Sequence, residues 1–221
     1  MAKKKYQGTS NDKERSMSKL IAAVGEVIRE KGYTGLTPTN IARTAGLSRR
    51  LITTYFGSAD KLIETYVRSR DYWVAATGNA GELIRENQGE NTMQILETLL
   101  HSQLDYFYRN EEMQKIVLWQ ISQSTRIMYE VCEDRERLGK AFFAITDEEL
   151  AGRGIDLRAI AALLISGIYY LVLHAHSTDS LFCDVDLNSA EGMQRVKNVI
   201  SFLIEKSYAH NTDITSGLIT G

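Results

Sequence analysis

The stretch Thr37–Leu62 reads TPTNIARTAGLSRRLITTYFGSADKL and decides the fold of the N-terminal part of the chain. Its apolar residues recur at helical spacing, and its helix breakers fall at Gly46 and Gly57. We therefore expect a short helix that ends near Ala45, a turn, a second short helix after Ser48, and the start of a further helix. Two short helices joined by a tight turn are typical of a helix-turn-helix.

The residues that border these helices fit their capping positions. Thr37 is a good N-cap, and Pro38 occupies the first helical position, where a missing N–H costs nothing. Gly46 suits the left-handed conformation of the turn, and Ser48 is expected to cap the second short helix. Upstream, an amphipathic helix is expected to begin near residues 10–12. These signals together predict a domain of three helices.

The second short helix has one face that a core helix would not need. Leu51, Ile52 and Phe56 can face inward, which leaves a polar and basic face on the other side. Arginine recognises guanine through O6 and N7, and threonine hydrogen-bonds a base or touches a thymine methyl. This helix is therefore expected to lie in the DNA major groove. The residues on its polar face are Arg49, Arg50, Thr53, Thr54 and Tyr55.

Other residues near this helix are expected to bind phosphate, which positions a protein on DNA without reading its sequence. Tyr55 and Lys61 have the reach and polarity for such contacts. The free N–H groups at the helix starts near Thr37 and Ser58 are further anion sites. The full set of predicted DNA-binding residues is Thr37, Thr39, Ser48, Arg49, Arg50, Thr53, Thr54, Tyr55 and Lys61.

The order of these residues resembles the signature of the TetR family of bacterial transcriptional regulators, over the stretch from Asp12 to Leu62. The matching positions are Lys31-Gly32-Tyr33, Thr37, Ile41-Ala42, Ala45-Gly46-Leu47-Ser48, Ile52, Tyr55-Phe56, Ser58 and Leu62. The family often has tyrosine where this chain has Thr53. Its frequent lysine at the head of the next helix is Ala59 here, so Lys61 would have to supply that phosphate contact. These departures concern DNA sequence preference more than the fold.

The resemblance implies a ligand-responsive transcriptional regulator, most often a repressor, that binds double-stranded operator DNA as a homodimer. The two recognition helices would enter successive major grooves of a near-palindromic operator, roughly 34–36 Å apart. The last two long helices of each subunit would form a four-helix interface. A small-molecule inducer in the larger domain would shift the helix that begins at Ser58 and release the DNA, which requires unequal binding to the two states.

Charge is divided unevenly along the chain. The net charge is −2 over 221 residues, but residues 1–70 contain 14 Lys and Arg against 6 Asp and Glu, and the remaining residues contain 12 against 22. A basic N-terminal segment on an acidic body favours a DNA-binding domain joined to one that avoids DNA. The chain begins with a polar basic segment rather than an export signal, so we expect a cytoplasmic protein with Cys132 and Cys183 reduced.

The rest of the chain is expected to be helical as well, which makes the fold class all-α. Further helices are expected over residues 81–87, 92–108, 111–122, 125–150 (unbroken or interrupted near Cys132), 156–177 and 189–208. The expected domains are a basic flexible arm (1–9), a helix-turn-helix DNA-binding domain (10–57), a larger helical ligand-binding and dimerisation domain (58–210), and a flexible tail (211–221).

One stretch raises a membrane alternative. Residues 159–178, AIAALLISGIYYLVLHAHST, contain no Asp, Glu, Lys or Arg over roughly the 20 residues that span a bilayer. The strongly apolar part is shorter than that, and the stretch stands alone among amphipathic segments. A helix at a core or a subunit interface is therefore the preferred interpretation, and no membrane association is expected.

Aromatic residues are plentiful in the helical body, and ligand pockets are mostly apolar with a few polar groups. The inducer is therefore expected to be apolar or aromatic, although any single aromatic residue more often packs in a core. The residues predicted to line its site are Trp119, Tyr129, Phe143, Tyr169, Tyr170 and His174.

The sequence predicts no catalytic site, metal site or cofactor. His174 and His176 stand two residues apart, so on a helix they point in different directions and cannot share one ion. A recombinase would need a serine or tyrosine nucleophile among several arginines, and no such cluster occurs outside the DNA-binding stretch. The alternative to a ligand-responsive regulator is a dimeric DNA-organising or protein-interaction factor on the same fold, without an inducer.

Overall fold

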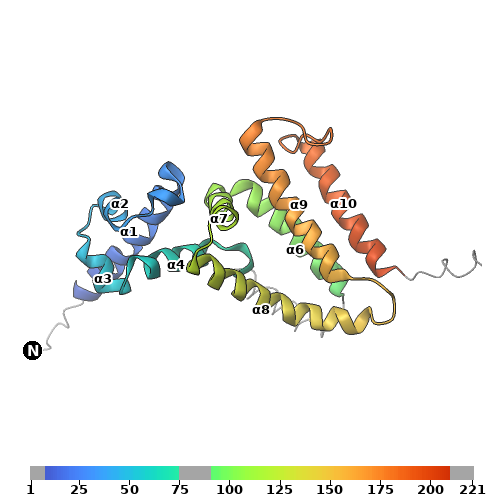
Figure 1. Ribbon diagram of the computed structural model, residues 1–221, viewed down its shortest axis with the longest axis horizontal. Helices are drawn as coiled ribbons and strands as arrows, with labels where there is room; N and C mark the ends of the chain where they lie inside the picture. The colour runs from blue at the N-terminus through green and yellow to red at the C-terminus, as the bar shows by residue number, and fades with distance from the viewer. Residues whose placement is uncertain (1–7, 75–90, 210–221) are drawn as a thin grey trace, which may run out of the picture. The chain divides into compact units, whose positions relative to one another are not determined.

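The computed structural model describes residues 8–74 and 91–209 of the chain. Within these ranges the chain is helical, and its only extended pairing is an isolated bridge between Phe182 and Val185 (Figure 1). This confirms the all-α fold class. The expected helix at residues 81–87 and the expected tail at 211–221 lie outside the described residues.

Two compact units make up the chain, residues 1–75 with 110–133 and residues 76–109 with 134–221. The helices of the first unit are α1 (Gly8–Lys31), the 3-10 helix η1 (Tyr33–Gly35), α2 (Pro38–Ala45), α3 (Arg50–Phe56), α4 (Ala59–Arg70) and α7 (Glu111–Ser122). The second unit contains α6 (Thr92–Arg109), α9 (Leu157–Thr178) and α10 (Ala190–Tyr208). Helix α8 (Arg126–Glu149) gives its first residues to the first unit and the rest to the second.

Some helix boundaries differ from those expected. Helix α1 already begins at Gly8, inside the expected arm, and α8 continues through Cys132 without a break. Helix α4 ends at Arg70, although apolar residues at helical spacing continue to Trp73 and Val74. The reason is Asp71, which has extended backbone angles and accepts a hydrogen bond from the backbone N–H of Val74 at 3.1 Å, as an N-cap of a new turn does.

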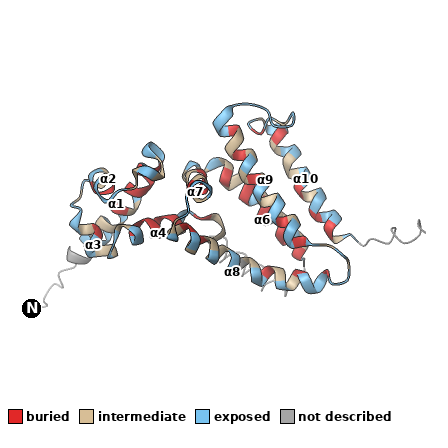
Figure 2. Cartoon of the chain, in the orientation of Figure 1, coloured by how far each residue is buried: buried red, intermediate tan, exposed pale blue. Residues whose placement is uncertain are grey.

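The first unit is held together by α1, which packs against α2, α4 and α7. The buried face of α1 follows from apolar residues spaced three and four apart, and Figure 2 shows it as a buried stripe. The short helices α2 and α3 add one main apolar side chain each. The core side chains are Leu20, Val24, Val27, Ile28, Ile41, Ile52, Leu62, Tyr66 and Val67, none more than 2% exposed.

Glu112, in the first turn of α7, ties α1 and α4 to α7. Its Oε1 accepts from Arg29 of α1, and its Oε2 accepts from the Tyr66 hydroxyl at 2.5 Å and pairs with Arg70 Nε at 2.9 Å. Burial and the bond to Glu112 raise the pKa of Tyr66, so its hydroxyl remains a donor. Glycine is required at Gly25, because a Cβ there would lie 2.8 Å from the Tyr66 hydroxyl oxygen.

The second unit is built on α6, against which α9 and α10 each pack. Polar bonds join α6 to α10: Lys197 Nζ pairs with Asp105 at 2.7 Å, and the Ser201 hydroxyl donates to Glu97 at 2.5 Å. Apolar side chains complete the interface. Those buried on these three helices include Leu96, Leu100, Leu104, Phe107, Ile168, Val172, Ile200 and Ile204.

Replacing Glu112 by alanine should lower the free energy of unfolding by about 1–3 kcal/mol, because it leaves the buried Tyr66 hydroxyl without an acceptor and removes both arginine pairs. Denaturant unfolding of Glu112→Ala measures this loss. Glu111→Ala is the matched control, since Glu111 stands beside it in the same helical turn but is exposed. Equal losses in the two variants would show that only the helix dipole is involved.

Candidate DNA-binding surface

The ends of α2, α3 and α4 are fixed by local hydrogen bonds. The Thr37 hydroxyl accepts from the N–H of Asn40 at 3.2 Å, and the Ser58 hydroxyl accepts from the N–H of Lys61 at 3.1 Å. Between α2 and α3, Gly46 adopts the left-handed conformation (φ 65°, ψ 31°) in which a side chain is strained. These bonds and this turn set the angle at which α3 leaves α2.

Helix α3 begins at Arg50, slightly later than expected. The Ser48 hydroxyl accepts from the N–H of Arg50 at 3.3 Å, and the Ser48 carbonyl accepts from Leu51. Arg49 already has helical backbone angles. Ser48 therefore has the hydrogen bonds of an N-cap.

The two faces of α3 are clearly divided. Ile52 is 2% exposed, and Leu51 and Phe56 are half-buried beside it. The opposite face carries exposed side chains at helical spacing, which are Arg49, Arg50, Thr53 and Thr54. The structure thus brings together the residues that the sequence predicts will read DNA bases.

Details of this face refine the predicted roles. Arg49 Nη1 lies 3.4 Å from the Thr39 hydroxyl, so the start of α2 helps to orient this arginine. The Thr54 hydroxyl donates to the Arg50 carbonyl at 2.9 Å, which leaves it as an acceptor or a methyl contact. Tyr55 is half-buried and so presents less of its ring than expected.

A shallow hollow of about 340 Å³ opens on this surface. Both arginines of the α3 face border it, together with the first residue of α2 and the first residue of α4. Its lining residues are Pro38, Arg49, Arg50, Ile52, Thr53 and Ala59. The hollow shows that the α3 side chains stand around open space rather than against their own unit.

Lys61 is exposed but engaged. Its Nζ pairs with Glu64 at 2.7 Å, and Arg68 pairs with the other Glu64 oxygen at 2.9 Å. The hydrogen bond from Lys61, aided by Arg68, holds the pKa of the Glu64 carboxyl below its ordinary value against the opposing effect of burial. To contact a DNA phosphate, Lys61 would therefore have to give up its ion pair with Glu64. Asp60 lies in the first turn of α4 and makes that helix start less suited to an anion than the start of α2, which has no acidic residue.

The six residues predicted for the inducer site occupy different surroundings. In the first unit, Trp119 is buried with its ring stacked on Tyr33 at 6.0 Å, whereas Tyr129 is 65% exposed. In the second unit, Phe143 lies under the Arg158 guanidinium at 5.0 Å.

The other three of these residues lie on α9. Tyr169 packs edge-on to Phe107 at 4.8 Å, and Tyr170 stacks on His174 at 5.8 Å. Tyr170 is 54% exposed. The structure does not gather the six residues around any hollow found among the described residues, and their contact with a ligand stays a prediction.

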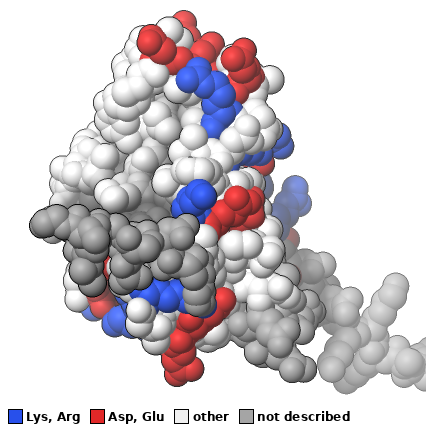
Figure 3. Space-filling view, turned by 90° about the vertical axis from the view of Figure 1, so that its right-hand side faces the viewer, with Lys and Arg blue, Asp and Glu red and all other residues white. Residues whose placement is uncertain are grey.

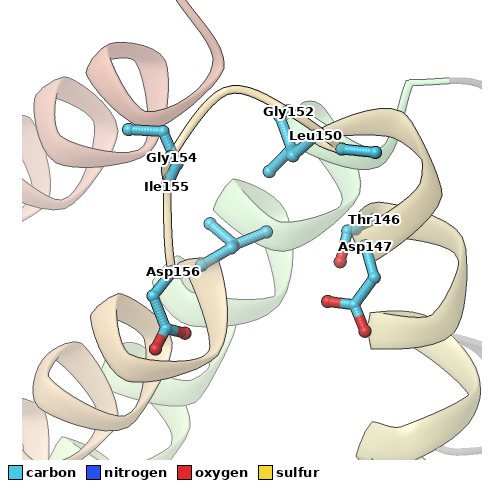
Figure 4. Close-up of a pocket in the computed structure, with 9 residues that line it drawn as sticks. Thr146, Asp147, Leu150, Gly152, Gly154, Ile155 and Asp156 are labelled. Atoms are coloured by element: carbon cyan, nitrogen blue, oxygen red, sulfur yellow. The ribbon is translucent and has the colours of Figure 1, made fainter.

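A hollow of about 330 Å³ lies at the turn from α8 to α9 (Figure 4). It is lined by turn residues such as Gly152 and Gly154 and bordered by the carboxylates of Asp147 and Asp156. Asp147 pairs with Arg158 at 2.6 Å, which lowers its pKa, and Asp156 caps α9. These carboxylates already have partners within the fold, and the lining mixes them with the apolar residues Leu150, Ile155 and Leu157.

Helices α9 and α10 share an exposed apolar face. A groove of about 290 Å³ runs between them, and Figure 3 shows a broad area of uncharged residues on this side of the described structure. The exposed apolar residues on the two helices are Leu163, Tyr170, Val199, Phe202 and Leu203.

Among the described residues, α9 is the one helix long and apolar enough to span a membrane, and 22% of its apolar stretch is buried. The buried-core interpretation of residues 159–178 therefore does not account for most of the helix.

Glu112 and its arginine partners did not stand out in the sequence. Glu111-Glu112 reads as ordinary acidic residues at a helix start, and Arg29 and Arg70 lie far from it along the chain. Only tertiary contacts reveal this cluster, because no local pattern distinguishes a paired carboxylate from an exposed one.

Comparison with known proteins agrees with this geometry. Residues 20–66 match the model of the family described as bacterial regulatory proteins, tetR family. No curated protein sequence matches the chain.

Several solved structures share the fold. A transcriptional regulator FadR from Bacillus subtilis, in complex with stearoyl-CoA, has a TM-score of 0.62 at 16% identity over 85% of this chain and 96% of that chain. NalD of Pseudomonas aeruginosa, the secondary repressor of the MexAB-OprM multidrug efflux pump, has a TM-score of 0.60 at 16% identity over 91% and 100%. A TetR family transcription regulator from Marinobacter aquaeolei has a TM-score of 0.62 at 14% identity over 88% and 97%.

At these identities the solved structures establish the fold, whereas the family match covers the helix-turn-helix itself. Both agree with the resemblance carried by residues Thr37–Leu62. Residues 20–66 therefore match the DNA-binding domain of the TetR family of bacterial regulatory proteins, and the described residues share the all-α fold of solved regulators of that kind.

Proposed function

We propose that the chain is a ligand-responsive repressor that binds a near-palindromic operator as a homodimer and leaves it when a small molecule binds. The observation that carries the proposal is the exposed polar and basic face of α3 on a packed three-helix core. The neighbour NalD is a repressor, and the neighbour FadR was solved with stearoyl-CoA, which supports this mode of action for the present chain. Its place of action would be the cytoplasm.

In this proposal α3 lies in the major groove. Arg49 and Arg50 read guanine edges, and Thr53 contacts a neighbouring base. Thr37 and Thr39, at the start of α2, hold a phosphate near the backbone N–H of Thr39, because Pro38 has no N–H and Asn40 donates to the Thr37 hydroxyl. Figure 1 shows α2 and α3 next to each other in the first unit, as a phosphate contact beside the groove requires.

The exposed apolar face of α9 and α10 would be the dimer interface. Large exposed apolar patches on a water-soluble protein mark interaction surfaces, and two helices from each subunit would close the groove between them. This assigns the uncharged run of α9 to a partner helix rather than to lipid. Residues 10–57 would then read DNA, and residues 58–210 would dimerise and bind the ligand.

The effector proposed for this chain is a largely apolar molecule. A ligand releases DNA only if it binds the non-operator arrangement more tightly than the operator-bound one. An acyl thioester is one candidate, because FadR was solved with stearoyl-CoA. Selection of duplexes from a random DNA pool, with and without added acyl-CoA, tests both halves of the proposal. A pool that yields no enriched duplex would contradict DNA reading.

Arg49→Ala and Arg50→Ala should each weaken binding to the selected duplex by about 1–3 kcal/mol and relax preference at one base pair, because a bidentate contact to guanine is lost. Fluorescence anisotropy on duplexes varied at each position measures both effects. Arg137→Ala is the control, since Arg137 is an exposed arginine of the second unit. Unchanged affinity and preference in both α3 variants would refute the assigned face.

Raising salt from about 50 to 200 mM should weaken operator binding by about 10³-fold, because phosphate contacts release counterions from DNA. Sucrose at the same osmolality serves as the control and should leave affinity nearly unchanged. A flat response to salt would contradict binding through phosphate-contacting cations.

Leu163→Glu or Val199→Glu should raise the dimer dissociation constant by about a hundredfold or more, because each interface would then bury an unpaired charge. Both residues are more than half exposed, so the subunit should still fold. Analytical ultracentrifugation measures the change, with Gln194→Glu, which adds the same charge to another face of α10, as control. Dimers of normal strength in both variants would rule out this interface.

A further inference from the structure

Gln103 on α6 is a buried side chain whose hydrogen-bonding capacity is unused. It is 0% exposed, and neither its Nε2 nor its Oε1 has a hydrogen-bond partner among the described residues. Most buried polar groups in folded proteins are paired. A buried donor or acceptor without a partner loses its hydrogen bonds to water and gains none in the protein, which lowers the stability of the fold. This amide therefore needs an explanation.

Three partly buried polar side chains in the middle of α6 have hydrogen-bond partners. Glu97, His101 and Asp105 recur every four residues on one face of the helix, and each contacts α10. Their partners are the Ser201 hydroxyl and the side chain or carbonyl of Lys197. Gln103 lies on a different face and does not share this network.

The surroundings of Gln103 along the helix are apolar. Leu99, Leu100 and Phe107 lie one turn away on the same side, and all three are buried. The ring of Phe107 meets that of Tyr169 on α9 at 4.8 Å. The amide is thus the polar group in an apolar setting, which is the composition of a small-molecule site.

We propose that Gln103 is the polar contact of the effector site, which deepens and rests on the proposed function. The ligand would have an apolar body and one neutral group that both donates and accepts a hydrogen bond, as a carboxamide does, because Gln103 offers Nε2 donors and an Oε1 acceptor. A charged group placed against Gln103 is disfavoured, because an amide cannot neutralise a buried charge, so the phosphates of an acyl-CoA would have to lie away from this contact. Retaining an unpaired polar group at a cost in stability is typical of functional sites.

Two measurements on the free protein, without DNA, test the assignment. The first is thermal stability: Gln103→Met and Gln103→Leu should leave Tm unchanged or raise it by up to about 4 °C, because an apolar side chain removes an unpaired amide. Gln114→Met is the control. Gln114 is the other buried glutamine of the described residues and has a partner, so this variant should lower Tm.

The second measurement is calorimetric binding of three probes that share a heptyl chain, namely octanamide, heptyl methyl ketone and octanoate. The wild-type chain should bind octanamide about tenfold more tightly than the other two, since only the amide can both donate and accept. Gln103→Met should bind the amide and the ketone equally.

Three results would overturn the assignment. A clear drop in Tm for both Gln103 variants would show that the amide has a structural role. Equal octanamide binding by the wild type and Gln103→Met would place the ligand elsewhere, and no binding of any probe to the wild type would remove the site. Selection of DNA duplexes uses the wild type alone. A failure of the proposed repressor function would therefore appear as a lack of enriched duplexes and can be distinguished from a failure of the Gln103 assignment.

Discussion

Helix α3 has seven residues, far fewer than an isolated helix needs to be stable in water. Its conformation therefore depends on tertiary packing, mainly the burial of Ile52, and on the turn at Gly46 and the hydrogen bonds of Ser48. Once Ile52 is fixed inward, the spacing of the helix forces the arginines and threonines of α3 outward. The function assigned to this surface depends on that single constraint.

The same unit also joins the DNA-binding helices to a helix outside the motif. Glu112 on α7 holds Arg29 of α1 together with Tyr66 and Arg70 of α4. Since α1 and α4 flank the helix-turn-helix in sequence, a displacement of α7 would act on both at once. In the proposed regulation this carboxylate offers a physical link through which a change in the body reaches α3, provided that the two arrangements bind the effector unequally.

Much of the DNA-binding unit could be predicted from sequence because its signals are local. The caps at Thr37 and Ser58, the glycine turn and the apolar spacing place both ends of α2 and the starts of α3 and α4 within a residue or two. The end of α4 before Asp71 cannot be predicted in this way, because apolar spacing continues past it and the deciding bond from the Val74 N–H depends on one side chain.

The ligand site could not be predicted in the same way. Tyr169 and Tyr170 are neighbours in sequence, yet one packs against Phe107 and the other is exposed. Contacts between segments that are distant in sequence decide which aromatic residue lines a site. Amino-acid composition does not reveal these contacts. Gln103 shows the same limit, because a glutamine in an amphipathic helix reads as a surface residue until its burial is known.

Methylation protection with dimethyl sulfate tests the central claim most directly, because this reagent modifies guanine N7 in the major groove and adenine N3 in the minor groove. On a selected duplex, the account predicts protection of guanine N7 in two groups about one helical turn apart, with adenine N3 unaffected. Protection confined to adenine N3, or no protection at all on a tightly bound duplex, would contradict the placement of α3 in the major groove.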